Sequence, residues 1–343
     1  MDYLIFRTDR IGDYIITSTL INSIKRNDTK ANINIVCSPK NIKFIKEFNP
    51  NLNVFLLKSN KLIDKVKLFL ILRKFKFDSI IVSDKKNRSI ILTLLLNSQN
   101  KIFNVSKYFQ KKILNLFYKK VFLDDEKILS NSKKVIMNEN SKAMGFKLID
   151  EDFHYLSDNQ FKKYYLHENI IQIDNLDFLI FHYDEKWELD NYSKMFKKAR
   201  DLTDIDPDAE TFKNFILDLA LKTSKTIIIS TGNAETRIIS KLIKSSKFIN
   251  DFIYKLDLKD VSCYLLINEN FFSMSHIISK SKLFIGCHGA FTHIASNYNI
   301  KILDIIEESK KNHYASFTEH MNNYKYLYRN NFNKLLNNII QVL

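Results

Sequence analysis

The chain has few of the residues that build tight turns, metal sites and disulfide frameworks. Its 343 residues include only 5 glycines, 3 prolines, 3 cysteines and 1 tryptophan. The cysteines, Cys37, Cys263 and Cys287, are odd in number and far apart. This spacing argues against a disulfide framework and against a CxxC-type zinc site, and favours buried thiols. No GxGxxG motif follows the first apolar segment, so a nicotinamide-dependent dehydrogenase ranks last among the enzyme classes considered.

Long apolar runs are also missing. Uncharged apolar stretches such as SIILTLLLNS (89–98) are about half the length that a membrane-spanning helix needs. The first residues lack the basic and apolar regions of a signal peptide, so we expect a cytoplasmic protein.

Positive charge is in excess, with a formal net charge of +15. This excess favours anionic partners, although a lysine-rich composition also arises from mutational bias in an AT-rich genome. No segment has a nucleic-acid-binding signature, and we expect no nucleic acid partner. The basic and aromatic stretch 107–122 has two interpretations: an amphipathic helix that docks on an anionic membrane surface, and a helix packed within the first domain.

Short apolar runs alternate with amphipathic stretches along most of the chain. This order is typical of an α/β protein with doubly wound parallel sheets. We expect a first domain over 1–165, a linker near 165–176, a second domain over 176–328 and a C-terminal helix over 329–343 that packs back on the first domain. The predicted strands span 2–7, 33–37, 53–57, 78–83, 101–105, 176–183, 225–232, 251–258, 283–289 and 300–306.

The segment RTDRIGD joins the first predicted strand to the first helix. We expect Gly12 to let the chain turn and the helix N-terminus to offer N–H groups to an anion. Asp13 has two interpretations, a partner of the helix dipole and a general base facing a cleft between the domains. Asp9 is expected to pair with Arg7 or Arg10.

Three strand ends in the second domain carry further polar groups. The turn STGNAE contains Gly232 and places Glu235 in the expected first turn of a helix, where a carboxylate binds ribose hydroxyls or simply complements the helix dipole. The segment GCHGAFTH suits a phosphate held by backbone N–H groups; a zinc site of Cys287, His288 and His293 and a nucleophilic Cys287 are weaker alternatives. Lys186, in FHYDEKW, has two interpretations: a lysine that contacts a phosphate, and a solvated surface lysine.

These motifs together resemble glycosyltransferase family nine, the heptosyltransferase-like enzymes of lipopolysaccharide synthesis. LIFRTDRIGDYIITSTLINSIKR resembles the family's apolar strand, R-x-D-R-[IL]-G-D motif and apolar helix. LFIGCHGAFTHIASNYNIKILDI resembles its D-[ST]-G-x-x-H-x-A strand and short helix, and STGNAE is similar to its Gly-x-x-Glu turn.

The resemblance implies a GT-B fold of two Rossmann-like domains that face a cleft, and a transferase that inverts the sugar without a metal or another cofactor. It implies that Asp13 is the catalytic base, with Arg10 and Thr17 contacting the acceptor or a phosphate. The first domain would bind a lipopolysaccharide, lipooligosaccharide or related surface-glycan acceptor, at the inner face of the inner membrane when that acceptor is a glycolipid. The second would bind a nucleoside diphosphate sugar. The donor-binding residues would be Gly12 of the first domain together with Lys186, Gly232, Glu235, His288, Gly289, Ala290, Thr292 and His293.

One departure from the family pattern concerns the donor sugar. Cys287 or His288 stands where the family has an acidic donor contact. The resemblance therefore leaves the sugar open, hexose or heptose, and a second hypothesis is a nucleotide- or glycan-binding protein of this fold that has lost catalysis.

Overall fold

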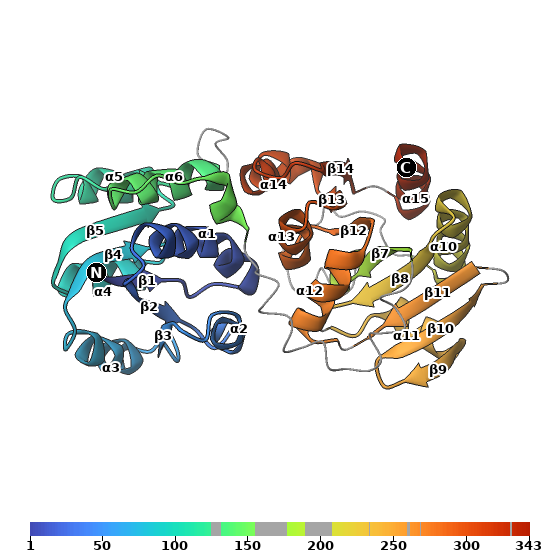
Figure 1. Cartoon of the computed structure of the whole chain (residues 1–343), viewed down its shortest axis with the longest axis horizontal. Helices are drawn as coiled ribbons and strands as arrows, with labels where there is room; N and C mark the ends of the chain where they lie inside the picture. The colour runs from blue at the N-terminus through green and yellow to red at the C-terminus, as the bar shows by residue number, and fades with distance from the viewer. Residues whose placement is uncertain are drawn as a thin grey trace. The chain divides into compact units, whose positions relative to one another are not determined.

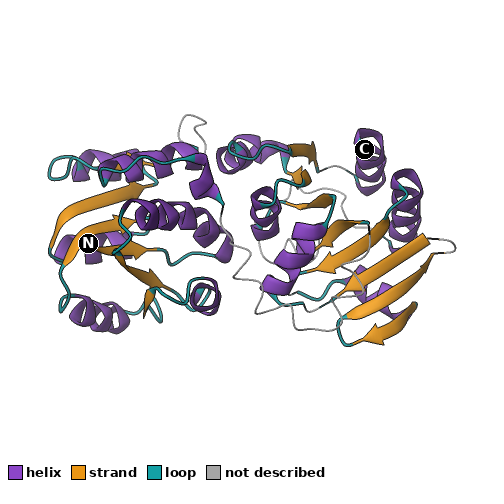
Figure 2. Cartoon of the chain, viewed as in Figure 1, coloured by secondary structure: helices purple, strands orange, loops and turns teal. Residues whose placement is uncertain are grey.

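The protein is described from a computed structural model, drawn in Figures 1 and 2. The described residues are 1–124, 132–154, 177–188, 208–232, 234–258, 261–267, 269–329 and 331–343. The chain divides into two compact units. Unit 1 contains Met1–Leu156 and Asn312–His320, and unit 2 contains Ser157–Lys311 and Met321–Leu343. The linker predicted near 165–176 lies outside the described residues.

Unit 1 is built on a parallel sheet in the order β3-β2-β1-β4-β5-β6. Its inner strands are continuous apolar runs because both faces of the sheet are covered by helices. The strands are β1 (Asp2–Phe6), β2 (Asn32–Cys37), β3 (Asn53–Leu56), β4 (Phe77–Val82), β5 (Ser98–Val105) and β6 (Val121–Leu123).

The helices of unit 1 form two layers. On one face α3 (Leu62–Leu72), α4 (Asn87–Leu95) and α5 (Tyr108–Leu114) share a core cluster with the strands. The helix α1 (Ile11–Asn27) contacts α6 (Lys133–Ala143) and the short 3-10 helix η2 (Asp150–Phe153). The remaining helices are α2 (Ile42–Phe48) and α14 (Lys311–Thr318).

Unit 2 contains a larger sheet in the order β14-β13-β12-β7-β8-β11-β10-β9. Strands β14 to β11 run parallel, whereas β10 pairs antiparallel with both β11 and β9. The strands are β7 (Phe178–Tyr183), β8 (Thr226–Thr231), β9 (Ser246–Asn250), β10 (Ile253–Leu258), β11 (Val261–Leu266), β12 (Leu283–Cys287), β13 (Lys301–Ile306) and β14 (Tyr324–Tyr328).

Helices alternate with most strands of unit 2, whereas β9, β10 and β11 follow one another without a helix between them. They are α10 (Ala209–Thr223), α11 (Arg237–Lys244), α12 (Phe271–Lys280), α13 (Ala290–Asn297), α15 (Phe332–Val342) and the 3-10 helices η4 (Glu185–Trp187) and η5 (Glu308–Lys310). Phe332, Leu335 and Ile339 of α15 belong to the core that α10 also enters. The buried side of the C-terminal helix thus packs in unit 2, and its predicted packing on the first domain stays a prediction. It is Asn312–His320 that belongs to unit 1.

The α/β class, the parallel sheets and most strands are confirmed, but the strand prediction is incomplete in both units, and in unit 1 it lacks β6. Residues 300–306 are not the last strand, because β14 follows, and β9 and β11 were not predicted. Within the described residues, no helix combines the length and the apolar character needed to cross a bilayer.

Candidate functional site

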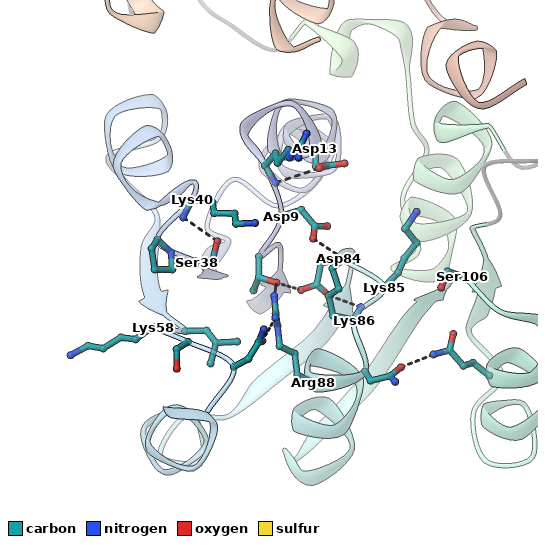
Figure 3. A pocket seen from close by; sticks show the side chains of 18 of the residues that line it. Asp9, Asp13, Ser38, Lys40, Lys58, Asp84, Lys85, Lys86, Arg88 and Ser106 are labelled. Atoms are coloured by element: carbon teal, nitrogen blue, oxygen red, sulfur yellow. Dashed lines mark hydrogen bonds and ion pairs between the residues drawn. The ribbon is translucent and has the colours of Figure 1, made fainter. Parts of the chain in front are cut away.

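A large cavity in unit 1 lies at the point of its sheet where the strand order reverses. Strands β1 and β4 are neighbours, but the chain goes on from β1 to β2 on one side and from β4 to β5 on the other. A crevice at the carboxyl ends of the strands is expected at such a switch point. The cavity there measures about 1090 Å³ and is lined by residues that follow β1 to β5, as Figure 3 shows.

Cations dominate the lining of this cavity. Three carboxylates line it, those of Asp9, Asp13 and Asp84. The lining contains seven cationic side chains, those of Arg10, Lys40, Lys58, Lys85, Lys86, Arg88 and Lys107. This excess of positive charge suits an anionic ligand.

Asp13 lies in the first turn of α1 and lines the cavity. Its Oδ2 atom accepts a hydrogen bond from the backbone N–H of Arg10, at 3.4 Å. The carboxylate thus complements the N-terminus of the helix while it remains partly exposed at the cavity. Both interpretations of Asp13 are compatible with this position.

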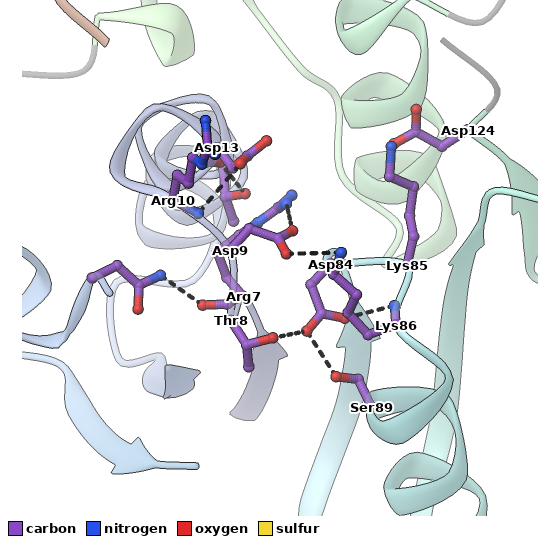
Figure 4. A network of polar contacts seen from close by, with 12 residues as sticks. Arg7, Thr8, Asp9, Arg10, Asp13, Asp84, Lys85, Lys86, Ser89 and Asp124 are labelled. Atoms are coloured by element: carbon purple, nitrogen blue, oxygen red, sulfur yellow. Dashed lines mark hydrogen bonds and ion pairs between the residues drawn. The ribbon is translucent and has the colours of Figure 1, made fainter. Parts of the chain in front are cut away.

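Asp84, two residues after the end of β4, lines the cavity and belongs to the network of polar contacts drawn in Figure 4. Its Oδ2 accepts hydrogen bonds from Thr8 Oγ1 at 2.5 Å and from Ser89 Oγ at 2.7 Å. Arg88 Nη2 donates to the same Thr8 hydroxyl at 2.7 Å. Burial raises the pKa of Asp84, which these hydrogen bonds partly oppose. The network orients Arg88 at the cavity wall.

Asp9 is held by two cations. Arg7 Nη1 donates to it at 3.2 Å, which confirms the predicted pairing, and Lys86 Nζ lies 3.5 Å from its other oxygen. Asp9 therefore has a structural role at the turn after β1.

Lys85 connects the cavity to the end of β6. It adopts a left-handed backbone conformation with φ of 57°, which is uncommon for a residue with a side chain. Its ammonium lies 3.4 Å from Asp124, a buried carboxylate that Lys133 also binds, at 2.6 Å.

Two predicted residues of the first helix have other surroundings than expected. Gly12 does not turn the chain, because α1 already begins at Ile11 and the turn is made by residues 7–10. Thr17 is fully buried, and its hydroxyl donates to the carbonyl of Asp13 at 3.0 Å. Thr17 is not among the residues that line this cavity, and its contact with an acceptor or a phosphate stays a prediction.

Unit 2 brings its predicted strand ends together. Strand β7 lies between β12 and β8, so the segments after these strands meet at one edge of the sheet. A Cβ atom on Gly289 would lie 3.2 Å from Lys186 Nζ, and one on Gly232 would lie 3.2 Å from the Cβ of Asp184. The glycines permit these close approaches.

Lys186 lies against the turn that follows β12. Its ammonium binds the carboxylate of Asp184 at 2.6 Å and the carbonyl of His288 at 2.9 Å. Burial disfavours the charged form of both groups, but the opposite charge of its partner stabilises each of them. The pKa of Lys186 is therefore raised and that of Asp184 is lowered. Lys186 is thus a charged part of this strand end and not a solvated surface lysine.

A second carboxylate, Asp304, organises the same turn from β13. Its Oδ2 lies 2.6 Å from Nδ1 of His288 and accepts from the hydroxyl of Tyr324 at 2.9 Å. Thr292 Oγ1 lies 3.3 Å from its Oδ1 and accepts from the backbone N–H of Gly289 at 3.2 Å.

The predicted phosphate turn forms the start of α13. Gly289 precedes the helix and Ala290 is its first residue. His293 is buried, with its ring centroid 5.4 Å from that of His288. The start of α13 therefore brings the two imidazoles close together.

Glu235 is not in the first turn of a helix, because α11 begins two residues later. It is exposed and accepts a hydrogen bond from Ser240 at 2.8 Å. The carboxylate that binds the N-terminus of α11 is Glu188, which accepts from the backbone N–H groups of Arg237 and Ile238, both at 2.8 Å. In this structure Glu235 binds the nearby Ser240, and its contact with the ribose of a donor stays a prediction.

The cysteine alternatives find no geometric support. Burial raises the pKa of Cys287 to about 11, and Arg329 donates to its sulfur at 3.0 Å. A nucleophilic cysteine needs the opposite shift. Across the described ranges, no three His, Cys, Asp or Glu side chains are grouped as metal ligands.

Sequence reasoning missed Asp84, Arg88, Asp184 and Asp304. The first two lie in SDKKNRS, a polar run directly after a predicted strand, so the same strand-end rule would have found them. Asp304 lies inside the apolar strand β13, and an acid in such a run is the signal that could have marked it.

No family model matches the chain, and no curated protein sequence does. Solved structures do. E. coli heptosyltransferase WaaC with ADP-2-deoxy-2-fluoro heptose is similar over 100% of this chain and 98% of its own, with a TM-score of 0.64 and 12% identity. A family 9 glycosyl transferase from Veillonella parvula matches 88% of this chain and 80% of its own, with a TM-score of 0.57 and 14% identity.

A third similar structure belongs to a different enzyme. UDP-GlcNAc 2-epimerase from Methanocaldococcus jannaschii matches 99% of this chain and 92% of its own, with a TM-score of 0.57 and 12% identity. The chain thus has the GT-B type of fold that was predicted. At these identities the likeness concerns the fold, and the chemistry has to be argued from the site.

Proposed function

We propose that the protein is an inverting, metal-independent glycosyltransferase that moves a sugar from a nucleoside diphosphate sugar to a bacterial surface glycan. The acceptor class is the lipopolysaccharide or lipooligosaccharide core or a related glycan. The protein would work in the cytoplasm, at the inner face of the inner membrane when the acceptor is a glycolipid.

The observation that carries the proposal is the position of Asp13. It places a carboxylate at a large cavity whose other charges are mostly cationic. Such a cavity suits an acceptor that bears phosphates or carboxylates, and Asp13 is the group there that can take a proton from the attacking hydroxyl. The acceptor oxygen would attack the anomeric carbon, the carbon–oxygen bond to the diphosphate would break, and its electron pair would leave with the nucleoside diphosphate.

The donor would bind at the strand ends of unit 2. The ammonium of Lys186, which binds the carbonyl of His288, lies close to Gly289 at the N-terminus of α13, and the imidazole of His288 belongs to the residue before Gly289. Cationic groups and helix N-termini stabilise the charge that develops on a departing diphosphate. Thr292, His293 and Asp304 would hold this turn in shape, while Gly232 and Glu235 would lie on the ribose side.

The similarity to an epimerase makes a direct assay necessary. Purified protein is incubated with a panel of nucleoside diphosphate sugars and a lipopolysaccharide core acceptor, and the products are identified by mass spectrometry. We expect glycosylated acceptor together with nucleoside diphosphate. Release of an altered sugar with no acceptor product would instead indicate epimerase chemistry.

Asp13→Asn tests the assigned base. We expect turnover to fall by about 10²- to 10⁴-fold while donor affinity is retained. Asp64→Asn is the matched control, because Asp64 also lies in a first helical turn but outside the cavity lining. Wild-type turnover by Asp13→Asn would refute the assignment.

The replacement of an acidic donor contact by Cys287 or His288 favours one alternative, a binding protein that has lost catalysis. Calorimetry separates the two: a wild-type protein that binds a nucleoside diphosphate without consuming any sugar nucleotide would support the alternative.

A further inference from the structure

The helices α3, α4 and α5 have apolar side chains on both their inner and outer sides. Their inner sides pack on the sheet of unit 1, where Leu72, Ile90 and Leu114 belong to one core cluster. A surface helix normally has a polar outer side, so a second apolar side needs an explanation.

The outer side of α3 is apolar near both of its ends. Leu62 and Ile63 are exposed at its start, and Leu70 and Ile71 near its end. The next helix, α4, exposes Leu95 in the same way.

The strongest exposure is found on α5 and the turn that follows it. Tyr108, Phe109, Leu116 and Phe117 are between 70% and 76% exposed. A single exposed apolar side chain is common on protein surfaces. A group of large ones on adjacent helices of one layer, however, indicates a binding surface.

Basic residues surround these apolar side chains. The segments 61–76 and 107–120 hold eleven Lys or Arg residues and one acidic residue, Asp64, which is bound by Ser59. Elsewhere in unit 1, α1 and α2 show no exposed large apolar side chain among the described residues. The combination is therefore a property of one face and not of the whole composition.

This face borders the cavity of unit 1. Lys58 and Asn60 before α3, Arg88 in the first turn of α4, and Lys107 and Gln110 around the start of α5 all line the cavity. A molecule held at the face by apolar contacts can therefore extend a polar head towards the cavity.

We propose that this α3–α5 face, the outer sides of α3, α4 and α5 with the turn 115–120, binds an anionic lipid bilayer. The aromatic and aliphatic side chains enter the boundary between headgroups and acyl chains, and the lysines contact anionic headgroups. The lysine stems lie along the apolar layer while their ammonium groups stay in water. The purpose of the contact rests on the proposed function: it brings the cavity to a lipid-linked acceptor.

Vesicle flotation with the full chain tests the proposal. Vesicles of phosphatidylcholine with phosphatidylglycerol are compared with vesicles of phosphatidylcholine alone. We expect the protein to float with the anionic vesicles. Lys111→Glu/Lys112→Glu should weaken partitioning by about tenfold or more, as should Leu116→Ser/Phe117→Ser, whose side chains are each 76% exposed.

Two matched controls distinguish binding through the α3–α5 face from nonspecific effects of net charge and of exposed apolar side chains elsewhere. Lys43→Glu/Lys46→Glu makes the same charge change on α2, and Leu221→Ser/Phe248→Ser removes exposed apolar side chains in unit 2. Both should float like the wild type. The proposal is wrong if the wild type stays with the soluble fractions, or if the control variants lose as much binding as the test variants.

A second copy of the chain is the competing occupant of the face. Size-exclusion chromatography tests this. If the wild type is a dimer that Leu116→Ser/Phe117→Ser dissociates, and it does not bind vesicles, the face binds a second copy and the proposal of bilayer binding is wrong. Flotation uses neither donor nor soluble acceptor. Its failure is therefore separate from a failure of sugar transfer.

Discussion

His288 and Asp304 form a close pair across neighbouring strands, with Nδ1 of the imidazole 2.6 Å from Oδ2 of the carboxylate. A carboxylate at Nδ1 keeps the hydrogen on that nitrogen and fixes the plane of the ring. Asp304 is fully buried, so it acts on a ligand only through other groups. We infer that it positions His288 for the donor diphosphate.

The first prediction concerns this pair. Asp304→Asn should weaken donor binding by about tenfold, similar to His288→Ala, and the double variant should be no worse than either single one, because both remove one interaction. Isothermal titration with a nucleoside diphosphate checks this. Tyr324→Phe, which removes another hydrogen bond to the same oxygen, is the control and should keep its affinity. Additive losses would contradict the positioning role.

The second prediction concerns the cavity of unit 1 and its proposed role in binding the acceptor. Arg88→Gln should raise the KM for an anionic acceptor by about tenfold and leave donor affinity unchanged, because a hydrogen bond to a charged group contributes about 1.5–3 kcal/mol. Lys43→Gln, on the exposed side of α2, controls for the change in net charge. Steady-state kinetics with each substrate varied separates the two effects. An equal loss for both substrates would argue against an acceptor role.

The third prediction concerns close packing at Gly289. A Cβ atom there would press on the ammonium of Lys186 from 3.2 Å, and that ammonium sits at the tip of a flexible side chain. Gly289→Ala should therefore reduce donor affinity with little change in melting temperature. Gly145→Ala should do the reverse, since Gly145 has a φ of +84° and a side chain there costs about 1–2 kcal/mol of stability. Calorimetry and thermal unfolding measure the two effects.

The fourth prediction concerns pH and the buried histidine of β7. Burial lowers the pKa of His182 to about 4, below its ordinary value of 6.5. The unfolded chain therefore binds the proton first as pH falls. The stability of unit 2 should be full above about pH 6.5 and fall as pH drops towards 4, by about 2 kcal/mol at pH 5.

The single tryptophan makes this measurable. Trp187 donates from Nε1 to the carbonyl of His182 at 2.9 Å, so its fluorescence reports the unfolding of unit 2 in urea. His182→Gln should lose most of the difference between pH 7 and pH 5. His320→Gln serves as the control, because its pKa is also lowered to about 4 by burial but it belongs to unit 1. A pH effect that survives in His182→Gln would contradict the assignment.

The sequence was informative where burial on both faces produces continuous apolar runs. Strands such as β1, β7 and β12 are of this kind, and their ends located Asp13, Lys186 and Gly289 correctly on the fold. The edge strands β9 and β14 are partly exposed and contain polar residues, so they lack that pattern. Strand β11 begins three positions after β10 ends, and no turn signal separates them.

The partners of the site residues needed the order of strands in the sheets. Asp84 reaches Thr8 only because β4 lies beside β1, and His288 meets Asp304 because β13 lies beside β12. Glu188 caps α11 from 49 residues away along the chain, whereas local charge patterning had suggested Glu235. Such long-range pairings follow from topology, which one sequence does not contain.

The segment Asn312–His320 has a consequence for how the chain is made. It belongs to unit 1, where Lys133 lies 4.7 Å from the ring of Phe317 and His320 stacks on Phe153, and His313 and Phe317 line the cavity. During synthesis the first unit therefore cannot be completed when its own 156 residues have left the ribosome; it must wait until residue 320 emerges. The cavity of unit 1 is complete only after most of the second unit has been translated.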